Sequence, residues 1–300
     1  MPARPLPPQL RRVPFSVPRA DELGVPRGRL RALDLSAPFH GVRATVPPAT
    51  HAERCAAFAA RMPVTQVFSH ATAALLWGVP LPSALERGPL HVSALRGREP
   101  RVPGVVGHRL RADRVRVGAV RGLPVVSACD SWCQLATALS HDDLVAAGDR
   151  LLGWPRPLVS ADELDAAIER HRGGRGTSAR DAARLDLRPG AASPRETRLR
   201  LQVIRAGFPE PELNAPIPLS AGWTAHGDLV FRAYGVLLEY DGEQHRGDDA
   251  QFHRDVERLN DLAADGWIVI RVGRRLPMQR ALDQLERAMR SRGWRGVRAS

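Results

Sequence analysis

Acidic side chains stand in segment 225–245 where a half-buried strand is normally apolar. The segment reads AHGDLVFRAYGVLLEYDGEQH, two apolar runs on either side of a short turn. A turn centred at residues 233–234 places Asp228 opposite Glu239 and puts Asp241 on the same face as Glu239, because strand residues alternate faces. Directly opposed side chains have Cβ atoms roughly 4.5–5.5 Å apart, where like charges repel. The pattern therefore predicts a cation between the two carboxylates.

A hard divalent ion suits this arrangement, because Mg²⁺ takes carboxylate oxygens at about 2.0–2.1 Å. We expect Asp228 and Glu239 to bind Mg²⁺ or Mn²⁺, since a lone charge in an apolar strand is costly unless paired or metal-bound. Two alternatives stay open. The first is a turn centred one residue later, which places Asp241 opposite Asp228. The second is an exposed face, on which the acids form salt bridges with some of the many arginines.

Two further residues near the hairpin have side chains suited to catalysis. Glu196 lies at the start of an expected helix and is a candidate third acid, but Ser193 and Glu196 also match a capping box, so a capping role is equally open. His245 follows the second strand and is a candidate general base, because its unperturbed pKa is about 6.5. The alternative for His245 is an exposed turn residue.

The charge of the whole chain points to a polyanionic partner. The 300 residues carry a formal net charge of +12, and all 44 basic side chains are arginine. The absence of lysine indicates a GC-rich coding bias, which weakens the arginine count as a functional signal. The surplus is concentrated at the front, where residues 1–190 hold 27 arginines against 17 acids. We expect DNA as a partner, gripped largely by the front of the chain.

Other features of composition narrow the class of protein. The three cysteines, Cys55, Cys129 and Cys133, form no framework and fit a reducing compartment. The Pro-broken N-terminus lacks the apolar region of a signal peptide, and no run approaches about 18 apolar residues. We therefore expect a cytoplasmic protein with no membrane partner and no small-molecule cofactor.

The first fifty residues suggest a DNA-binding module. Residues 1–20 are rich in Pro and Arg, and we expect a disordered basic tail. A short helix ending at Gly24, a helix from Pro26 to Leu33 and a small wing at 39–43 follow the order of a winged helix-turn-helix over residues 21–48. The second helix would display three arginines to DNA. These are Arg27, Arg29 and Arg31. An ordinary helical pair with solvated arginines is the alternative.

Residues 51–190 alternate between helical and strand patterns. Helices are expected at 52–61, 69–78, 130–139, 142–152, 160–172 and 178–185, with short strands between 90 and 127. Ser69 is a plausible N-cap, so we interpret His70 as a helix-start residue. His91 and His108 lie in separate strands, where a structural role is more common than one in lining a pocket. We place the domain boundary near residue 190.

The last part of the chain, 191–300, predicts a mixed sheet with helices packed on it. The expected order is a helix at 193–206, an edge strand at 213–219, the acidic hairpin, a helix at 249–265, a strand at 267–272 and a helix at 276–290. With the strands and helices before it, the whole chain is expected to be an α/β (α+β) protein. An acid from the preceding helix and two acids on adjacent strands form the metal site of many nucleases.

The C-terminal part resembles a known nuclease-like group. HGDLVF, LLEYDGEQH and QFHRDVERLNDLAADGWIVIRV together are similar to the domain of unknown function 559 group. That group resembles very-short-patch-repair endonucleases of the restriction-endonuclease-like PD-(D/E)XK superfamily. The likeness covers about residues 193–290. It implies that Asp228 is the acid of the PD motif, although Gly227 precedes it, and that Glu239 is the (D/E) acid.

Two features of that motif bear on activity. Asp241 stands where the superfamily consensus has lysine, which removes the group that orients water and makes His245 the implied substitute. Arg254 and Arg258 fall on the helix after the motif, where they share a face and are candidates for phosphate contact, with solvated charge as the alternative.

The front half resembles the abortive-infection type IV antitoxin proteins. The likeness is carried by GVPRGRLRALDLSAPFHGVRA and FSHATAALLWGVPLP. It implies a DNA-binding winged helix and a toxin partner. Three hypotheses remain: a Mg²⁺-dependent DNA endonuclease, a non-catalytic DNA-binding regulator or antitoxin, and a structural fold with no nucleic-acid role.

Overall fold

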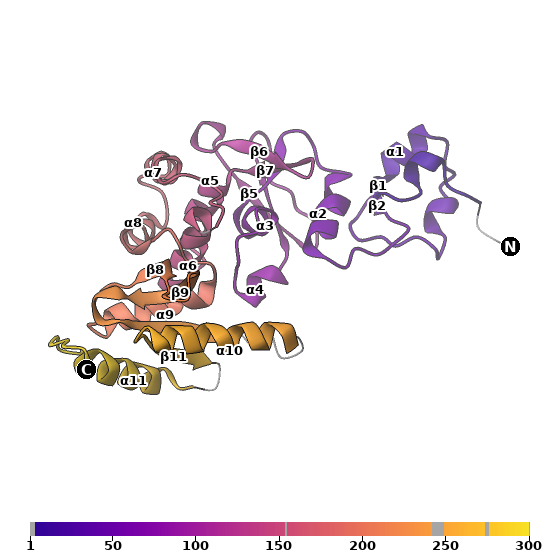
Figure 1. Ribbon diagram of the computed structural model, residues 1–300. Coiled ribbons are helices and arrows are strands. Elements are labelled where there is room, and N and C mark those ends of the chain that lie inside the picture. Colours follow the sequence, from indigo (N-terminus) through magenta and orange to yellow (C-terminus); the bar gives the residue numbers. More distant parts are fainter. Residues whose placement is uncertain (1–3, 154, 242–248, 274–275, 300) are drawn as a thin grey trace. The chain divides into compact units, whose positions relative to one another are not determined.

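The computed structural model of the protein describes residues 4–153, 155–241, 249–273 and 276–299. The chain divides into two compact units, one of residues 1–139 with 159–181 and the other of 140–158 with 182–300. Each unit contains a mixed sheet with helices, which confirms the expected α/β (α+β) class (Figure 1). None of the described helices is long and apolar enough to cross a membrane.

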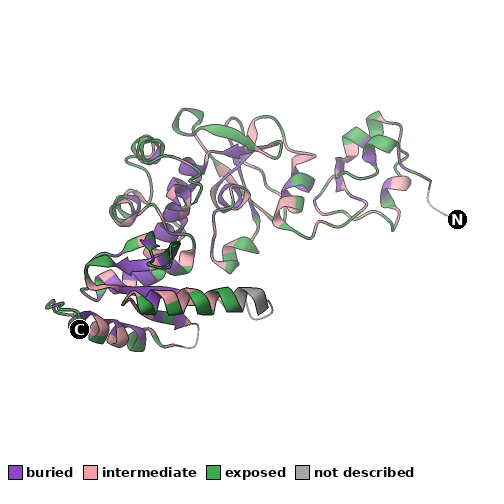
Figure 2. Ribbon diagram, in the orientation of Figure 1, coloured by how far each residue is buried: buried purple, intermediate pink, exposed green. Residues whose placement is uncertain are grey.

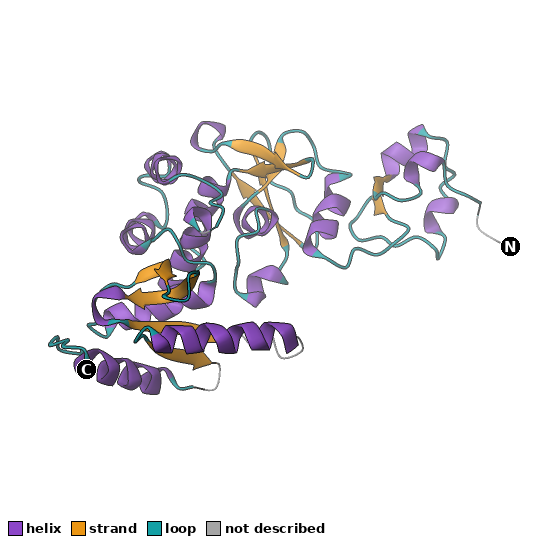
Figure 3. Ribbon diagram, in the orientation of Figure 1, coloured by secondary structure: helices purple, strands orange, loops and turns teal. Residues whose placement is uncertain are grey.

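The first unit begins with a small substructure of short elements (Figure 3). Strands β1 and β2 pair antiparallel through Phe15 and Arg43. Leu6, Leu10 and Phe15 are buried in its core. The prediction of a disordered tail is therefore wrong for residues 4–20, whose apolar side chains pack. The elements are η1 (Pro8–Leu10), β1 (Phe15–Ser16), α1 (Val17–Glu22), η2 (Arg29–Arg31) and β2 (Val42–Arg43).

The prediction of a second helix in the winged module is also wrong. In place of a helix from Pro26 to Leu33 the chain makes a three-residue 3₁₀ turn, and Leu33 is fully exposed. Arg29 bonds both oxygens of Asp34, at 2.8 and 2.7 Å, and the carbonyl of Arg4. Only Leu30 of this turn is buried, so no apolar stripe exists to hold a longer helix against the core.

A five-stranded sheet of order β5-β4-β3-β7-β6 follows in the first unit. β3 runs antiparallel to β4 and parallel to β7, and β4 runs parallel to β5. Helix α5 packs between α3 and α7. The strands are β3 (Gln66–Phe68), β4 (Leu90–Ala94), β5 (Val105–Arg109), β6 (Val117–Val120) and β7 (Leu123–Val126). The helices are α2 (His51–Ala59), α3 (His70–Leu76), α4 (Ser83–Glu86), η3 (Ala112–Arg114), α5 (Ala128–Leu135), α7 (Ala161–Arg170) and α8 (Thr177–Asp186), which ends in the second unit.

The second unit is built on a four-stranded sheet of order β11-β10-β9-β8, in which β10 and β11 are parallel and the other pairs antiparallel. The predicted edge strand is therefore confirmed as β8. The elements are α6 (His141–Leu152), α9 (Pro194–Arg205), β8 (Glu212–Pro218), β9 (Thr224–Phe231), η4 (Arg232–Tyr234), β10 (Val236–Asp241), α10 (Asp249–Ala264), β11 (Ile268–Gly273) and α11 (Met278–Ser291).

Helices cover both faces of this sheet. One core joins apolar side chains of α9 and α11 to Leu229 and Leu238, and the other joins Leu262 of α10 to Val230 and Leu237. The neighbouring residues 229 and 230 thus face opposite sides, as the period of a strand requires. Figure 2 shows the result, with β9 and β10 mostly buried and the outer side of α10 exposed.

The faces of β8 and β9 exchange at one point, next to the predicted acid of β9. Ala225 packs on the α10 side while Leu229 packs on the α9 side, although strand alternation places residues four apart on one face. Opposite this point Asn214 of β8 has a left-handed backbone, with φ of 42°. Asp228 lies between these two positions of β9, and its side chain is half-buried.

Candidate functional site

The predicted hairpin register is confirmed. Phe231 pairs with Val236 and Leu229 with Leu238, and this ladder ends one position before Asp228. There the Asp228 carboxylate replaces a backbone acceptor, because its Oδ2 accepts a hydrogen bond from the amide of Tyr240 at 2.7 Å.

The Asp228 carboxyl is half-buried and close to other negative charges. Burial raises its pKa, the carboxylates of Glu196 and Glu239 raise it further, and the Tyr240 amide and Arg258 oppose the change, leaving the pKa at about 7. A carboxyl with this pKa is only partly ionised at neutral pH, and a bound cation would favour the ionised form. Asp228 therefore lies in a locally negative environment suited to a metal ion.

Glu239 is buried, with 7% of its surface exposed. Both of its oxygens accept hydrogen bonds from Arg258 of α10, with Nη2 to Oε2 at 2.6 Å. This pair raises the pKa of Arg258, through the hydrogen bond first and the nearby negative charge as well. The alternative expectation, pairing with arginine, is thus met for Glu239. The pair is bidentate, and its carboxylate is buried and not on an exposed face.

Glu196 serves the start of α9 and also approaches the site. Ser193 Oγ accepts from the Glu196 amide at 3.3 Å, and Glu196 Oε2 accepts from the Ala192 amide and from Asn214 Nδ2, both at 2.9 Å. The capping role is confirmed, although the Glu196 side chain bonds the amide of Ala192, one residue before the cap. One carboxylate oxygen is occupied by these bonds, while the charge still acts on Asp228.

A buried ion pair anchors the helix that carries Glu196. Asp149 of α6 accepts from Thr197 at 2.8 Å and from Arg200 at 3.0 Å, and also from the Arg188 amide at 2.8 Å. Asp149 and Arg200 each have 1% of their side chain exposed. Burial raises the pKa of Asp149 despite these partners. The network fixes α9 against α6 and so sets the position of Glu196.

The remaining predicted residues lie in different settings. Asp241 is the last residue of β10, paired with Gly273, and its side chain lies outside the described residues, as does the whole of His245. Arg254 is exposed on α10, whereas Arg258 turns toward Glu239. In the first unit, Arg27 and Arg31 are exposed and Arg29 is held by Asp34.

A second cluster, in the first unit, was missed at the sequence level. His70, His91 and His108 meet there, and each offers a ligand atom within 4.8 Å of the other two. Within the described parts of the chain, this is the one group of three or more His, Cys, Asp or Glu side chains with such spacing. The signal in the sequence is weak, because His91 and His108 lie seventeen residues apart and each strand histidine by itself indicates a structural role.

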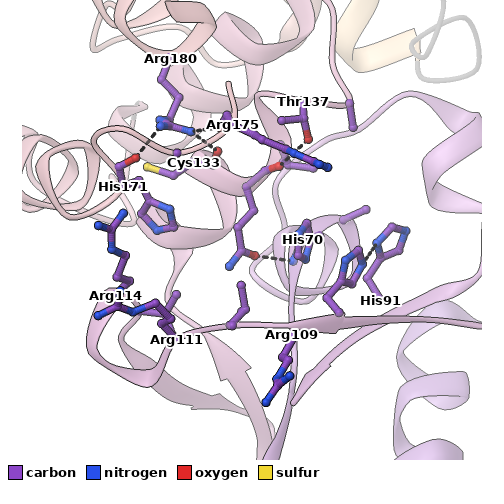
Figure 4. Close-up of a pocket in the computed structure, with 18 of the residues that line it drawn as sticks. His70, His91, Arg109, Arg111, Arg114, Cys133, Thr137, His171, Arg175 and Arg180 are labelled. Atoms are coloured by element: carbon purple, nitrogen blue, oxygen red, sulfur yellow. Dashed lines mark hydrogen bonds between the residues drawn. The ribbon is translucent and has the colours of Figure 1, made fainter. Parts of the chain in front are cut away.

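The three histidines line a pocket of about 450 Å³ (Figure 4). The pocket is also bordered by cationic side chains and by His171, whose Nε2 lies 3.1 Å from Oδ1 of the fully buried Asp130. Burial acts to raise the pKa of Asp130, but hydrogen bonds from His171, Ser127 and the Arg116 amide hold it below its ordinary value. The cationic residues are Arg109, Arg111, Arg114, Arg175 and Arg180.

Buried Arg180 shapes one wall of this pocket. Its guanidinium donates to the carbonyls of Arg175 and His171, each at 2.7 Å, and to Thr177 Oγ1 at 2.7 Å. These bonds close the loop between α7 and α8 around the guanidinium.

Comparison of the chain with protein families, with curated proteins and with solved structures found no match.

Proposed function

We propose that the second unit is a Mg²⁺- or Mn²⁺-dependent DNA endonuclease that hydrolyses phosphodiester bonds, with Asp228 and Glu239 as the metal ligands. The observation that carries the proposal is geometric: half-buried Asp228 and buried Glu239 lie on the adjacent strands β9 and β10, next to the end of their ladder, where the Tyr240 amide holds the Asp228 carboxylate. Burial and the carboxylates of Glu196 and Glu239 raise the pKa of Asp228 to about 7. Perturbed acids of this kind are concentrated at functional sites.

The donor set fits a hard cation. Mg²⁺ keeps several waters and is commonly held by one or two carboxylates, so two acids suffice. When bound, such an ion polarises the scissile phosphate and lowers the pKa of a coordinated water. The Tyr240 amide fixes one Asp228 oxygen at 2.7 Å and leaves the other oxygen as the candidate ligand.

Arg258 gives the proposed site a cation of its own. Its guanidinium holds both oxygens of Glu239 and compensates a charge that burial makes costly. If Glu239 takes a metal ion, the same guanidinium is left beside the site as a donor to a phosphate oxygen. Planar guanidinium groups suit phosphate recognition.

The sequence likeness supports the proposal for the same part of the chain. The segments that resemble the very-short-patch-repair-like group correspond to β9, β10, α10 and β11, and α9 supplies the preceding acid. The resemblance implies that Asp241 takes the place of the consensus lysine and that His245 is the candidate general base. The net charge of +12 supports a polyanionic substrate.

The test is cleavage of supercoiled plasmid and linear duplex DNA with Mg²⁺ or Mn²⁺. We expect the full chain to cut, and Asp228→Asn and Glu239→Gln to lose about 100- to 1000-fold in rate, the range seen when a main electrostatic group is removed. Glu212→Gln is the matched control, because Glu212 is an exposed acid of the same sheet paired with Arg232. Equal cutting by all four proteins would refute the assignment.

A non-catalytic role is favoured by one specific observation. Arg258 occupies both oxygens of Glu239, so the acids are partly neutralised without a metal ion. On that alternative the protein is a DNA-binding regulator or an antitoxin with a toxin partner. It predicts salt-dependent binding to duplex DNA and no cleavage by the wild-type chain with either ion.

A further inference from the structure

The three clustered histidines of the first unit come from separate elements. His70 is the first residue of α3, His91 lies in β4 and His108 in the neighbouring parallel strand β5. Nδ1 of His91 lies 2.9 Å from Nε2 of His108, and the rings of His70 and His108 stack with centroids 3.8 Å apart. One ligand atom of each imidazole therefore lies within 4.8 Å of the other two, in a space where Figure 4 shows His70 and His91.

The nitrogens in this space are chemically suited to a metal ion. Burial lowers the pKa of His70 to about 3 and that of His91 to about 4, each with further lowering by His108, and it also lowers the pKa of His108. Burial thus favours the neutral form of all three rings. A neutral imidazole keeps one nitrogen lone pair, and the close contact between His91 and His108 can hold only one proton between its two nitrogens.

We propose that His70, His91 and His108 form a binding site for one divalent transition-metal ion of the Zn²⁺ class, with a fourth position open to the pocket. Three imidazoles and one exchangeable ligand are a common donor set for Zn²⁺. Imidazole also suits Ni²⁺, Co²⁺ and Cu²⁺, whereas Mg²⁺ takes oxygen ligands. The site is independent of the endonuclease proposed for the second unit.

The spacing of the ligand atoms is near that of a bound ion. Zn–N distances of about 2.0–2.1 Å correspond to N···N separations of roughly 3.3–3.4 Å in a tetrahedral site. The pair at 2.9 Å lies inside that value, and all three atoms lie within 4.8 Å. Binding of one ion therefore requires the 2.9 Å contact between His91 and His108 to open, by rotation of imidazoles that are only half-buried.

Outer residues orient His70 for this role. Ser93 Oγ donates to Ser69 Oγ at 2.7 Å, and Ser69 Oγ lies 3.0 Å from His70 Nδ1. If Nδ1–H donates to Ser69, Nε2 is the unprotonated nitrogen and can bind a metal. Such hydrogen bonds to the non-ligating nitrogen are usual for metal-binding histidines. Ser69 and Ser93 are fully buried, so water does not compete for the hydrogen bond between them.

The backbone of His70 is held in an uncommon conformation. Its φ is 49°, in the left-handed region, where a non-glycine residue costs of order 1 kcal/mol or more. The conformation is stabilised by a hydrogen bond of 2.8 Å from the His70 amide to Oε1 of Gln134 on α5. A helix start needs no such geometry, whereas the stacking of His70 on His108 depends on where this turn directs the ring.

The pocket charge indicates the class of the fourth ligand. Arg109, Arg111 and Arg114 border the same pocket as the histidines, and Asp113 pairs with Arg111 at its exposed edge. Neutral imidazoles leave the full charge of a divalent ion uncompensated, and the arginines add to it. The fourth position therefore suits an anion, or a water molecule that ionises readily, better than a second neutral side chain.

The test is metal retention by the full chain. The protein is stripped with a chelator, exchanged into Zn²⁺, freed of excess ion and analysed for metal, and Co²⁺ is titrated in parallel by visible absorption. We expect one ion per chain, a Co²⁺ spectrum of tetrahedral type, and weakening of at least about 100-fold in His91→Gln and His108→Gln, more than loss of an outer partner costs.

His40→Gln is the matched control, because His40 is exposed in the same unit. Asp228→Asn controls for ions held by the second unit. Circular dichroism and urea unfolding of each variant separate loss of metal from loss of fold. Retention of Zn²⁺ unchanged in folded His91→Gln and His108→Gln, or no retention by the wild-type chain, would overturn the proposal. Neither result depends on cleavage activity, so the endonuclease proposal is tested separately.

Discussion

The two units bring together ligand groups of opposite kinds. In the first, three imidazoles converge from α3, β4 and β5; in the second, carboxylates of α9 and β10 are near enough to raise the pKa of Asp228 on β9. Burial acts on both in the same way, because it disfavours the charged form and so lowers the pKa of His70 and raises that of Asp228. One cause thus shifts the two kinds of group in opposite directions, and their donor atoms differ, imidazole nitrogen being preferred by Zn²⁺ and carboxylate oxygen by Mg²⁺.

The units also differ in how their buried charges are compensated. Glu239 is neutralised by Arg258, so the second unit carries its own cation at the candidate site. The histidine cluster is neutral and surrounded by arginines, so an ion there would attract an anion. The contrast teaches that a raised or lowered pKa alone does not identify the ligand; the type of donor atom does.

The largest expected effect separates the two sites by substitution. Asp228→Asn should lower Mg²⁺-dependent DNA cleavage about 100- to 1000-fold, roughly 3–4 kcal/mol of transition-state stabilisation, and leave Zn²⁺ retention unchanged. His91→Gln should do the reverse. Plasmid cleavage and metal analysis on the same preparations check both. If either variant lost both properties while remaining folded, the two sites would not be independent.

Removal of the internal cation of the second unit should have the next largest effect. Arg258→Met leaves Glu239 buried without its partner, and we expect a loss of about 3 kcal/mol in unfolding free energy in the absence of metal. Added Mg²⁺ should restore part of it, because a bound ion replaces the lost charge. Urea unfolding measures both. Arg232→Met, which removes an exposed pair, should cost about 1 kcal/mol or less.

The outer shell of the histidine cluster should show a smaller effect. Ser69→Ala removes the acceptor next to His70 Nδ1, and we expect Zn²⁺ affinity to fall about 10- to 100-fold. Ser160→Ala is the control, since Ser160 also precedes a helix of the first unit but caps it directly. It should lower stability by about 1 kcal/mol and leave affinity unchanged. Competition titration with a chromogenic chelator distinguishes the two.

The smallest effect expected is a pair of opposite pH dependences without metal. Asp228 has a folded pKa of about 7 against an ordinary 3.8, so its folded form holds the proton longer and its contribution to stability falls as pH rises from 4 to 7. His70 and His91, with pKa values of about 3 and 4 against an ordinary 6.5, contribute stability that is lost as pH falls below 6.5.

Asp228→Asn should therefore flatten the pH dependence of the second unit and stabilise it at pH 8 by about 1–2 kcal/mol, with the dielectric response of the protein keeping the gain below the full shift. Urea unfolding at pH 5, 6.5 and 8 provides the measurement. An unchanged slope in the variant would show that Asp228 titrates normally in the folded chain.

Much of the second unit was predictable because its signals are local. The alternation of apolar residues in 225–241 predicted the register that pairs Leu229 with Leu238, and Ser193 with Glu196 predicted the start of α9. A strand's period and a helix cap depend on residues within a few positions of one another. The capping box that Ser160 and Glu163 form in the first unit likewise joins residues only three positions apart.

Local signals failed where packing decides. The turn at 29–31 has proline, glycine and arginine patterns that also suit a helix, but only Leu30 finds a core, so a longer helix gains nothing. The Pro- and Arg-rich beginning is ordered because Leu6, Leu10 and Phe15 bury against this substructure. Composition predicted disorder there, because a count of residue types does not show that three apolar side chains meet in one core.

What the sequence determined by itself was the order of elements after residue 190, the hairpin register and the presence of acids on adjacent strands. Only the tertiary structure decided that Arg258 of α10 reaches Glu239, and that His70, His91 and His108 meet in one pocket. The physical reason is that faces and caps are set by neighbours along the chain. Convergence of side chains from separate elements is set by how those elements pack, and a left-handed turn at His70 leaves no mark in the sequence.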